Sequence, residues 1–142
     1  MPLNSSWKLF AFGSAFFAGL TAILGKLGVE GLNSNLATLV RTVVIMALTA
    51  MIVSFRDEWH WPQETSGRAV SFLVLSGIAT GLSWLCYYRA LQMAPVSLVA
   101  PIDKLSVVFA IVLAVIFLGE AVNLKLIVGG GLMIAGALVL AV

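Results

Sequence analysis

Apolar segments long enough to cross a lipid bilayer fill most of this sequence. Apolar residues make up 61% of the 142 residues and charged residues only 10%, whereas about 25% of a soluble domain is charged. The mean hydropathy of +1.10 is correspondingly high. We therefore predict an all-α integral membrane protein without a soluble domain.

Short polar turns divide the apolar sequence into segments close to the roughly 20 residues that a membrane-spanning helix needs. They predict five transmembrane helices in one domain over residues 1–142, at approximately 7–27, 36–55, 69–92, 96–118 and 124–142. An odd number of spans places the two ends of the domain on opposite faces of the membrane.

The fourth predicted span carries an unusual concentration of polar residues, because Asp103, Lys104 and Ser106 follow Pro101. An Asp or Lys at mid-membrane costs about 2.5–3.5 kcal/mol. These residues therefore require a watery or protein-lined interior. Pro101, which lacks a backbone N–H, is expected to displace or kink the first turn of this span.

Asp103 and Lys104 lie about 100° apart on a helix, so each is expected to find a partner other than its neighbour. Asp103 is a candidate proton or cation site, because a low dielectric disfavours a charged carboxylate. A structural ion pair with Arg41 or Arg89 is the alternative, and the sequence leaves both open.

Four basic residues are expected at one leaflet, where the first and third spans end and the second and fourth begin: Lys26, Arg41, Arg89 and Lys104. The acids at a similar depth are Glu30 and Asp103, so the vestibule would be positive and would favour carboxylates or other anions. Alternatively, Lys26 and Arg89 extend to the headgroups at helix ends.

Trp84 and Tyr88 are one turn apart on the third span and could form an aromatic wall around an organic substrate. Helix packing is the alternative role for this face.

Signatures of other function classes are missing from the sequence. It has no metal-ligand cluster, phosphate-binding glycine loop or nucleophile elbow. It also lacks a basic run, and its formal charge is only +2. We therefore expect no enzymatic activity, no cofactor, no metal and no nucleic-acid partner.

The basic residues do not determine the orientation of the chain. One side of the membrane would receive Lys8, Arg56, Arg68 and Lys125, and the other the four basic residues named above. If those four line an interior, the positive-inside rule places the N-terminus in the cytoplasm. If all eight count, the chain can insert both ways and pair as an inverted homodimer.

The run YYRALQMAPVSLVAPIDKLSVVFAIVLAVIFLGE, together with AILGKLG and LNSNLATLVRTVV, resembles the EamA domain of the drug/metabolite transporter superfamily. Most members carry two such domains as an inverted repeat of ten helices. This chain resembles one half, as in the five-helix bacterial and archaeal subgroup, which implies the cytoplasmic membrane of a prokaryote. The positions that match recurrent polar residues of the family are Lys26, Arg41, Tyr88, Arg89, Asp103, Lys104 and Ser106.

The resemblance implies a secondary transporter, usually an exporter, of a small organic metabolite such as an amino acid or its relatives. With a single domain, the leading hypothesis is an antiparallel homodimer that works by alternating access. A paralogue could replace the second copy. A dimeric channel and a non-transporting subunit that stabilises a partner are the other hypotheses.

Overall fold

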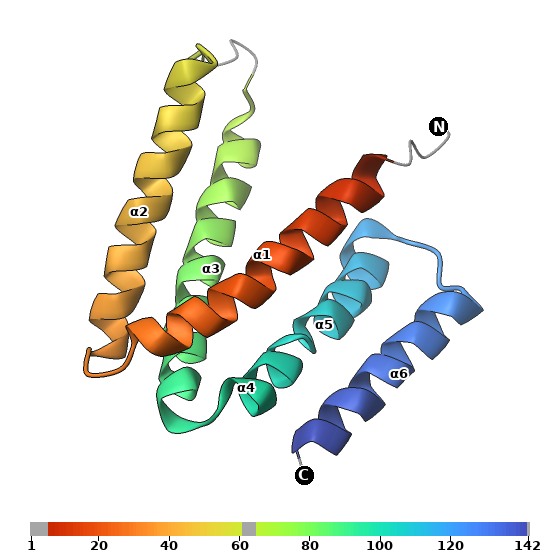
Figure 1. Cartoon of the computed structure of the whole chain (residues 1–142). Helices are drawn as coiled ribbons and strands as arrows, with labels where there is room; N and C mark the ends of the chain where they lie inside the picture. Colours follow the sequence, from red (N-terminus) through yellow and green to blue (C-terminus); the bar gives the residue numbers. More distant parts are fainter. Residues whose placement is uncertain (1–5, 61–64, 142) are drawn as a thin grey trace. The chain divides into compact units, whose positions relative to one another are not determined.

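The computed structural model describes residues 6–60 and 65–141 of the chain, and these are predominantly helical. Five helical segments are long and apolar enough to cross a membrane, which confirms the predicted all-α membrane architecture. The predicted end of the fifth span, Val142, lies outside the described residues. The elements are α1 (Ser6–Gly28), α2 (Ser34–Phe55), α3 (Gly67–Met93), α4 (Val96–Asp103), α5 (Ser106–Leu113), the π-helical segment η1 (Ala114–Leu118) and α6 (Leu124–Ala141). Figure 1 labels the six α-helices.

The chain forms two compact units. One comprises residues 25–92, and the other comprises residues 1–24 and 93–142. The first contains α2, α3 as far as Gln92 and the last turn of α1. The second contains the remainder of α1 and the elements from α4 to α6.

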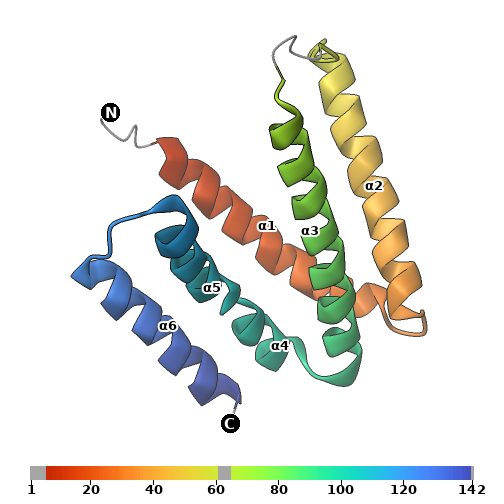
Figure 2. The same ribbon diagram turned by 180° about the vertical axis from the view of Figure 1, so that it is seen from behind.

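In the unit formed by residues 25–92, α2 begins at the same end at which α3 finishes (Figures 1 and 2). Local side chains fix where both helices start. The Asn33 side-chain oxygen accepts a hydrogen bond from the Asn35 N–H at 2.8 Å, and Ser66 Oγ accepts one from the Arg68 N–H at 3.2 Å. Such caps satisfy N–H groups that have no partner within the helix.

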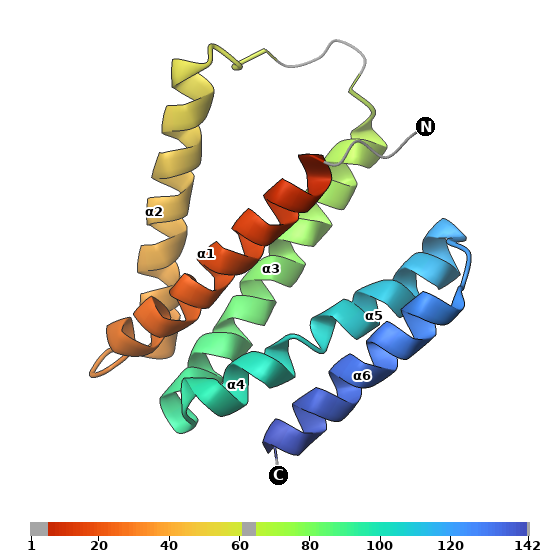
Figure 3. The same cartoon turned by 45° about the vertical axis from the view of Figure 1, so that its right-hand side comes forward.

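The fourth span is not a continuous α-helix. It consists of α4, a turn at Lys104 and Leu105, α5 and then η1, and the turn is visible between α4 and α5 in Figure 3. The Leu105 N–H bonds to the Ile102 oxygen at 3.0 Å, and the Val107 N–H bonds to the Lys104 oxygen at 3.1 Å. These bonds span three residues instead of four, so the backbone tightens at the turn.

The break lies beyond Pro101, which is inside α4. The first turn of the span therefore forms and is not displaced by Pro101, whereas a kink at this proline stays a prediction. Its missing N–H removes one bond within α4, whereas the chain leaves the α-helical path only after Asp103.

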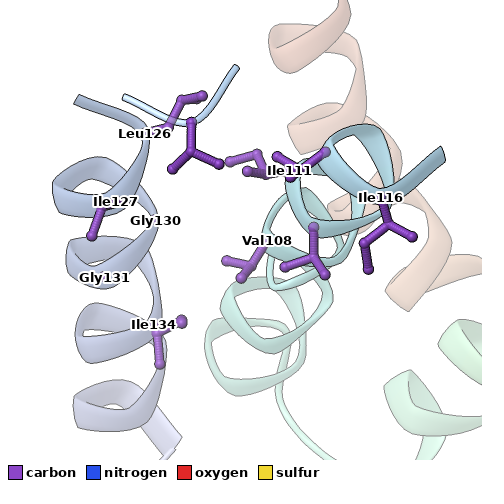
Figure 4. A pocket seen from close by; sticks show the side chains of 11 residues that line it. Val108, Ile111, Ile116, Leu126, Ile127, Gly130, Gly131 and Ile134 are labelled. Atoms are coloured by element: carbon purple, nitrogen blue, oxygen red, sulfur yellow. The ribbon is translucent and has the colours of Figure 1, made fainter. Parts of the chain in front are cut away.

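An apolar hollow of about 390 Å³ lies between α5, η1 and α6. Figure 4 shows Val108 and Ile111 facing α6, on which Gly130 and Gly131 leave room beside Ile134. All the residues that line this hollow are apolar. It therefore suits hydrocarbon and does not provide a site for a polar metabolite.

We predict that Gly119→Ala destabilises the protein by about 1–2 kcal/mol, because Gly119 ends η1 in the left-handed conformation with φ of 68°. A Cβ at Gly119 would meet nothing within 4 Å, so the cost is in the backbone alone. Thermal unfolding of the two proteins in detergent measures this loss of stability. Gly77→Ala is the control, since Gly77 lies within α3 with equally open space and should tolerate alanine. Equal stability of the Gly119→Ala protein and the wild type would contradict the prediction.

Candidate functional site

The Arg41 guanidinium lies over two aromatic rings of α3. Its central carbon is 4.1 Å from the centroid of the Trp84 ring and 5.6 Å from that of Tyr88. Its Nη1 donates a hydrogen bond of 3.3 Å to Tyr88 Oη. Arg41 is seven residues from the start of α2, about 10 Å along the helix axis.

A cation stacked on aromatic rings is stabilised by the negative face of the ring, by about 0.5–2 kcal/mol depending on desolvation. The stack also bears on the predicted aromatic wall. Trp84 and Tyr88 lie on one face of α3, as the aromatic wall requires. The group that both rings contact in this structure is the Arg41 side chain.

Tyr88 is held in place by a glycine of α1. Only 5% of Tyr88 is exposed, and a Cβ built on Gly25 would lie 3.3 Å from Tyr88 Oη. The absence of a side chain at Gly25 therefore lets the tyrosine ring lie against the backbone of α1. Gly25 belongs to the same 25–92 unit as Tyr88.

Lys26 and Gln92 connect the ends of α1 and α3. Lys26 Nζ donates to the Leu91 carbonyl oxygen at 2.5 Å. Gln92 Nε2 donates to the Leu32 oxygen at 2.6 Å and to the Val29 oxygen at 3.4 Å. A polar hollow of about 260 Å³ adjoins Lys26 and Gln92.

Arg89 lies on a different face of α3 from the Trp84–Tyr88 pair. It is exposed, and its Nη1 donates to Gln92 Oε1 at 3.3 Å. A second hollow, of about 410 Å³, is bordered by Arg89, Cys86 and Leu85 of α3 and by residues 33–35. Arg89 therefore does not share the stack formed by Arg41.

Asp103, Lys104 and Ser106 belong to the other unit, at the break between α4 and α5. Lys104 Nζ lies 3.2 Å from Asp103 Oδ2. The expectation that these neighbours cannot meet was wrong, because the helix ends at Asp103 and the turn lets the flexible lysine reach back. Ser106 is exposed at the start of α5.

The Asp103–Lys104 pair contributes little to stability, because the lysine side chain is 53% exposed and the pair is partly solvated. Convergence of this pair with Arg41 and Arg89 on one cavity stays a prediction.

Sequence reasoning did not single out Gln92. The available signal was its position one turn after Tyr88, as an amide at the end of an otherwise apolar span. The Gln92 amide nitrogen donates to backbone carbonyls, and no sequence pattern indicates which carbonyls a side chain will reach.

The chain matches the EamA-like transporter family over residues 5–142. It belongs to that family. A protein from Sinorhizobium sp named "Uncharacterized transporter in cobO 3'region" is 49% identical over 140 residues, covering 99% of each chain. No solved structure matches this EamA chain. The family, the relative and the five apolar helices together identify an integral membrane transporter.

We predict that Gly25→Leu displaces Tyr88 and destabilises the protein by about 1–3 kcal/mol, because extra atoms in a packed contact force neighbouring groups apart. Gly28→Leu is the matched control, since a Cβ at Gly28, in the same last turn, meets nothing within 4 Å. Thermal unfolding of the two purified variants tests this difference. Equal unfolding temperatures for both variants and the wild type would show that the Gly25–Tyr88 contact contributes nothing.

Proposed function

We propose that this protein is a secondary transporter that exports a small organic metabolite bearing a carboxylate or similar anionic group, such as an amino acid or a relative. It works by alternating access as an antiparallel homodimer in the cytoplasmic membrane of a prokaryote. Arg41 binds the anionic group, and Trp84 and Tyr88 hold the guanidinium in position. Asp103, Lys104, Arg89 and Ser106 contribute further polar groups to the substrate pathway.

The observation that carries this proposal is the environment of Arg41. Ion pairs among the described residues join Arg56 to Glu58 and Asp103 to Lys104, and neither includes Arg41. The Arg41 side chain instead stacks on Trp84 and donates to a neutral hydroxyl. A cation in a membrane-spanning helix is costly, so its charge remains available for an anion that arrives from outside the chain.

The chemistry of guanidinium favours a carboxylate as that anion. Arginine presents a planar fork of N–H donors that matches two oxygens of a carboxylate. The aromatic rings cover one face of the fork, while the edge carries the donors. Basic residues also exceed acidic ones at this end of the 25–92 unit, where Lys26, Arg41 and Arg89 accompany Glu30.

The homodimer is supported by charge and by length. If all eight basic residues count while the chain inserts, four fall on each side of the membrane and neither orientation is strongly preferred. The relative from Sinorhizobium sp, which is named a transporter, matches this five-helix chain over 99% of its own length. An inverted pair of such domains would reproduce the inverted-repeat plan in which substrates bind between two halves.

We predict that Arg41→Gln lowers affinity for the substrate by about 10- to 150-fold, the equivalent of one charged hydrogen bond of roughly 1.5–3 kcal/mol. Arg41→Lys should recover only part of the lost affinity, because an ammonium lacks the planar fork of donors. A panel of amino acids and other carboxylates is screened for thermal stabilisation of the purified protein. Uptake of the stabilising compounds into proteoliposomes is then measured.

Arg68→Gln is the control for that experiment, because Arg68 lies 5.6 Å over the Phe72 ring in the same unit but at the start of α3. It should retain wild-type affinity. Wild-type affinity in Arg41→Gln, or an equal loss in Arg68→Gln, would contradict the proposed role. Conductance far above carrier turnover would indicate a channel instead.

We predict that single cysteines introduced near the two ends of a Cys86→Ser chain are both labelled from outside the cell, because the population contains both orientations. An impermeant maleimide applied to intact cells measures the labelling. Labelling of one end alone would refute the antiparallel homodimer and leave transport itself untouched.

A further inference from the structure

Backbone carbonyls gather where α1 and α3 end. The last four carbonyls of a helix have no N–H partner within it, and that end of the helix is negative. Among the described residues, Lys26 donates to the Leu91 oxygen of α3, and Gln92 donates to the Val29 and Leu32 oxygens that follow α1. The Val29 oxygen also accepts from the Leu32 N–H at 3.4 Å.

We propose that Lys26 and Gln92 are positioning residues that form a helix-end clamp, and that they do not bind substrate. The clamp consists of the Lys26–Leu91 bond and the bonds from Gln92 to Leu32 and Val29. It holds the last turn of α1 against the last turns of α3 and thereby fixes the geometry of Arg41. This role rests on the proposed function of Arg41 in anion binding.

A short chain of contacts connects the clamp to Arg41. Leu91, whose carbonyl Lys26 binds, is fully buried and lies one turn after Tyr88. Gly25, adjacent to Lys26, contacts the Tyr88 ring. Tyr88 Oη accepts the hydrogen bond from Arg41, which stacks on Trp84. Loosening the contact between α1 and α3 therefore frees Tyr88 and, through it, the guanidinium.

The residue types suit this role. An ammonium carries three donors and is favoured at the negative end of a helix. The Gln92 amide donates to two carbonyls while its oxygen accepts from Arg89 at 3.3 Å. A glutamate of the same shape could accept from Arg89 but could not donate to the carbonyls.

Trp84 fluorescence reports the stack without any substrate. Trp7, Trp59 and Trp61 are replaced by Phe, which leaves Trp84 as the single tryptophan. The emission and acrylamide quenching of Trp84 are compared among Lys26→Met, Lys26→Arg, Gln92→Glu and the reference Arg41→Gln, which lacks the stack. Lys125→Met is the matched control, because it removes an exposed lysine near the start of α6.

We expect Lys26→Met and Gln92→Glu to move Trp84 quenching most of the way to the Arg41→Gln value while helix content by circular dichroism is retained. Lys26→Arg, which keeps a donor, and Lys125→Met should match the parent. Unchanged quenching in Gln92→Glu and Lys26→Met would overturn the proposal, as would Lys26→Arg shifting as far as Lys26→Met.

If Lys26→Met does not fold, Gln92→Glu and Lys26→Arg decide between these outcomes. The readout also separates the clamp from the proposed function. A chain whose Trp84 signal responds as expected, but which binds no carboxylate in the stability screen, retains the clamp and refutes the anion site.

Discussion

The stacking of the Arg41 guanidinium on Trp84, with its hydrogen bond to Tyr88, is the interaction on which this account depends. A permanent charge inside a membrane span is costly unless the protein surrounds it with polar or π-electron partners. The aromatic rings stabilise the guanidinium without neutralising it, as a carboxylate would. The proposed site thus combines a fixed position with a positive charge that no carboxylate among the described residues pairs with, which is what the recognition of an anion requires.

The neighbouring residues can be understood as the support of that stack. Gly25 leaves room for the Tyr88 ring, and the polar side chains at the ends of α1 and α3 join the two helices beside it. The broken fourth span carries an ion pair, in contrast to the guanidinium stacked on aromatic rings. Its Asp103–Lys104 pair is neutral as a whole and partly solvated, so it can change partners at modest cost.

The sequence predicted the architecture well, because span length and hydropathy follow directly from the thickness of the bilayer. It also brought Arg41, Trp84 and Tyr88 forward as candidates, since charges and aromatic residues stand out in an apolar chain. It failed at Asp103 and Lys104, where an assumption of continuous helix gave the wrong geometry. It could not find the role of Gln92, because a bond to a backbone carbonyl leaves no trace in the identity of the partner residue.

Nuclear magnetic resonance of guanidinium groups in arginine-labelled protein tests the central claim most directly. Protons of Arg41 held over the Trp84 ring should be shifted upfield relative to those of Arg56 and Arg89, and the shift should vanish in Trp84→Leu. Addition of a bound carboxylate should then shift the Arg41 signals and leave those of Arg56 unchanged. Arg41 signals that coincide with those of the exposed arginines and do not respond to Trp84→Leu would contradict the account.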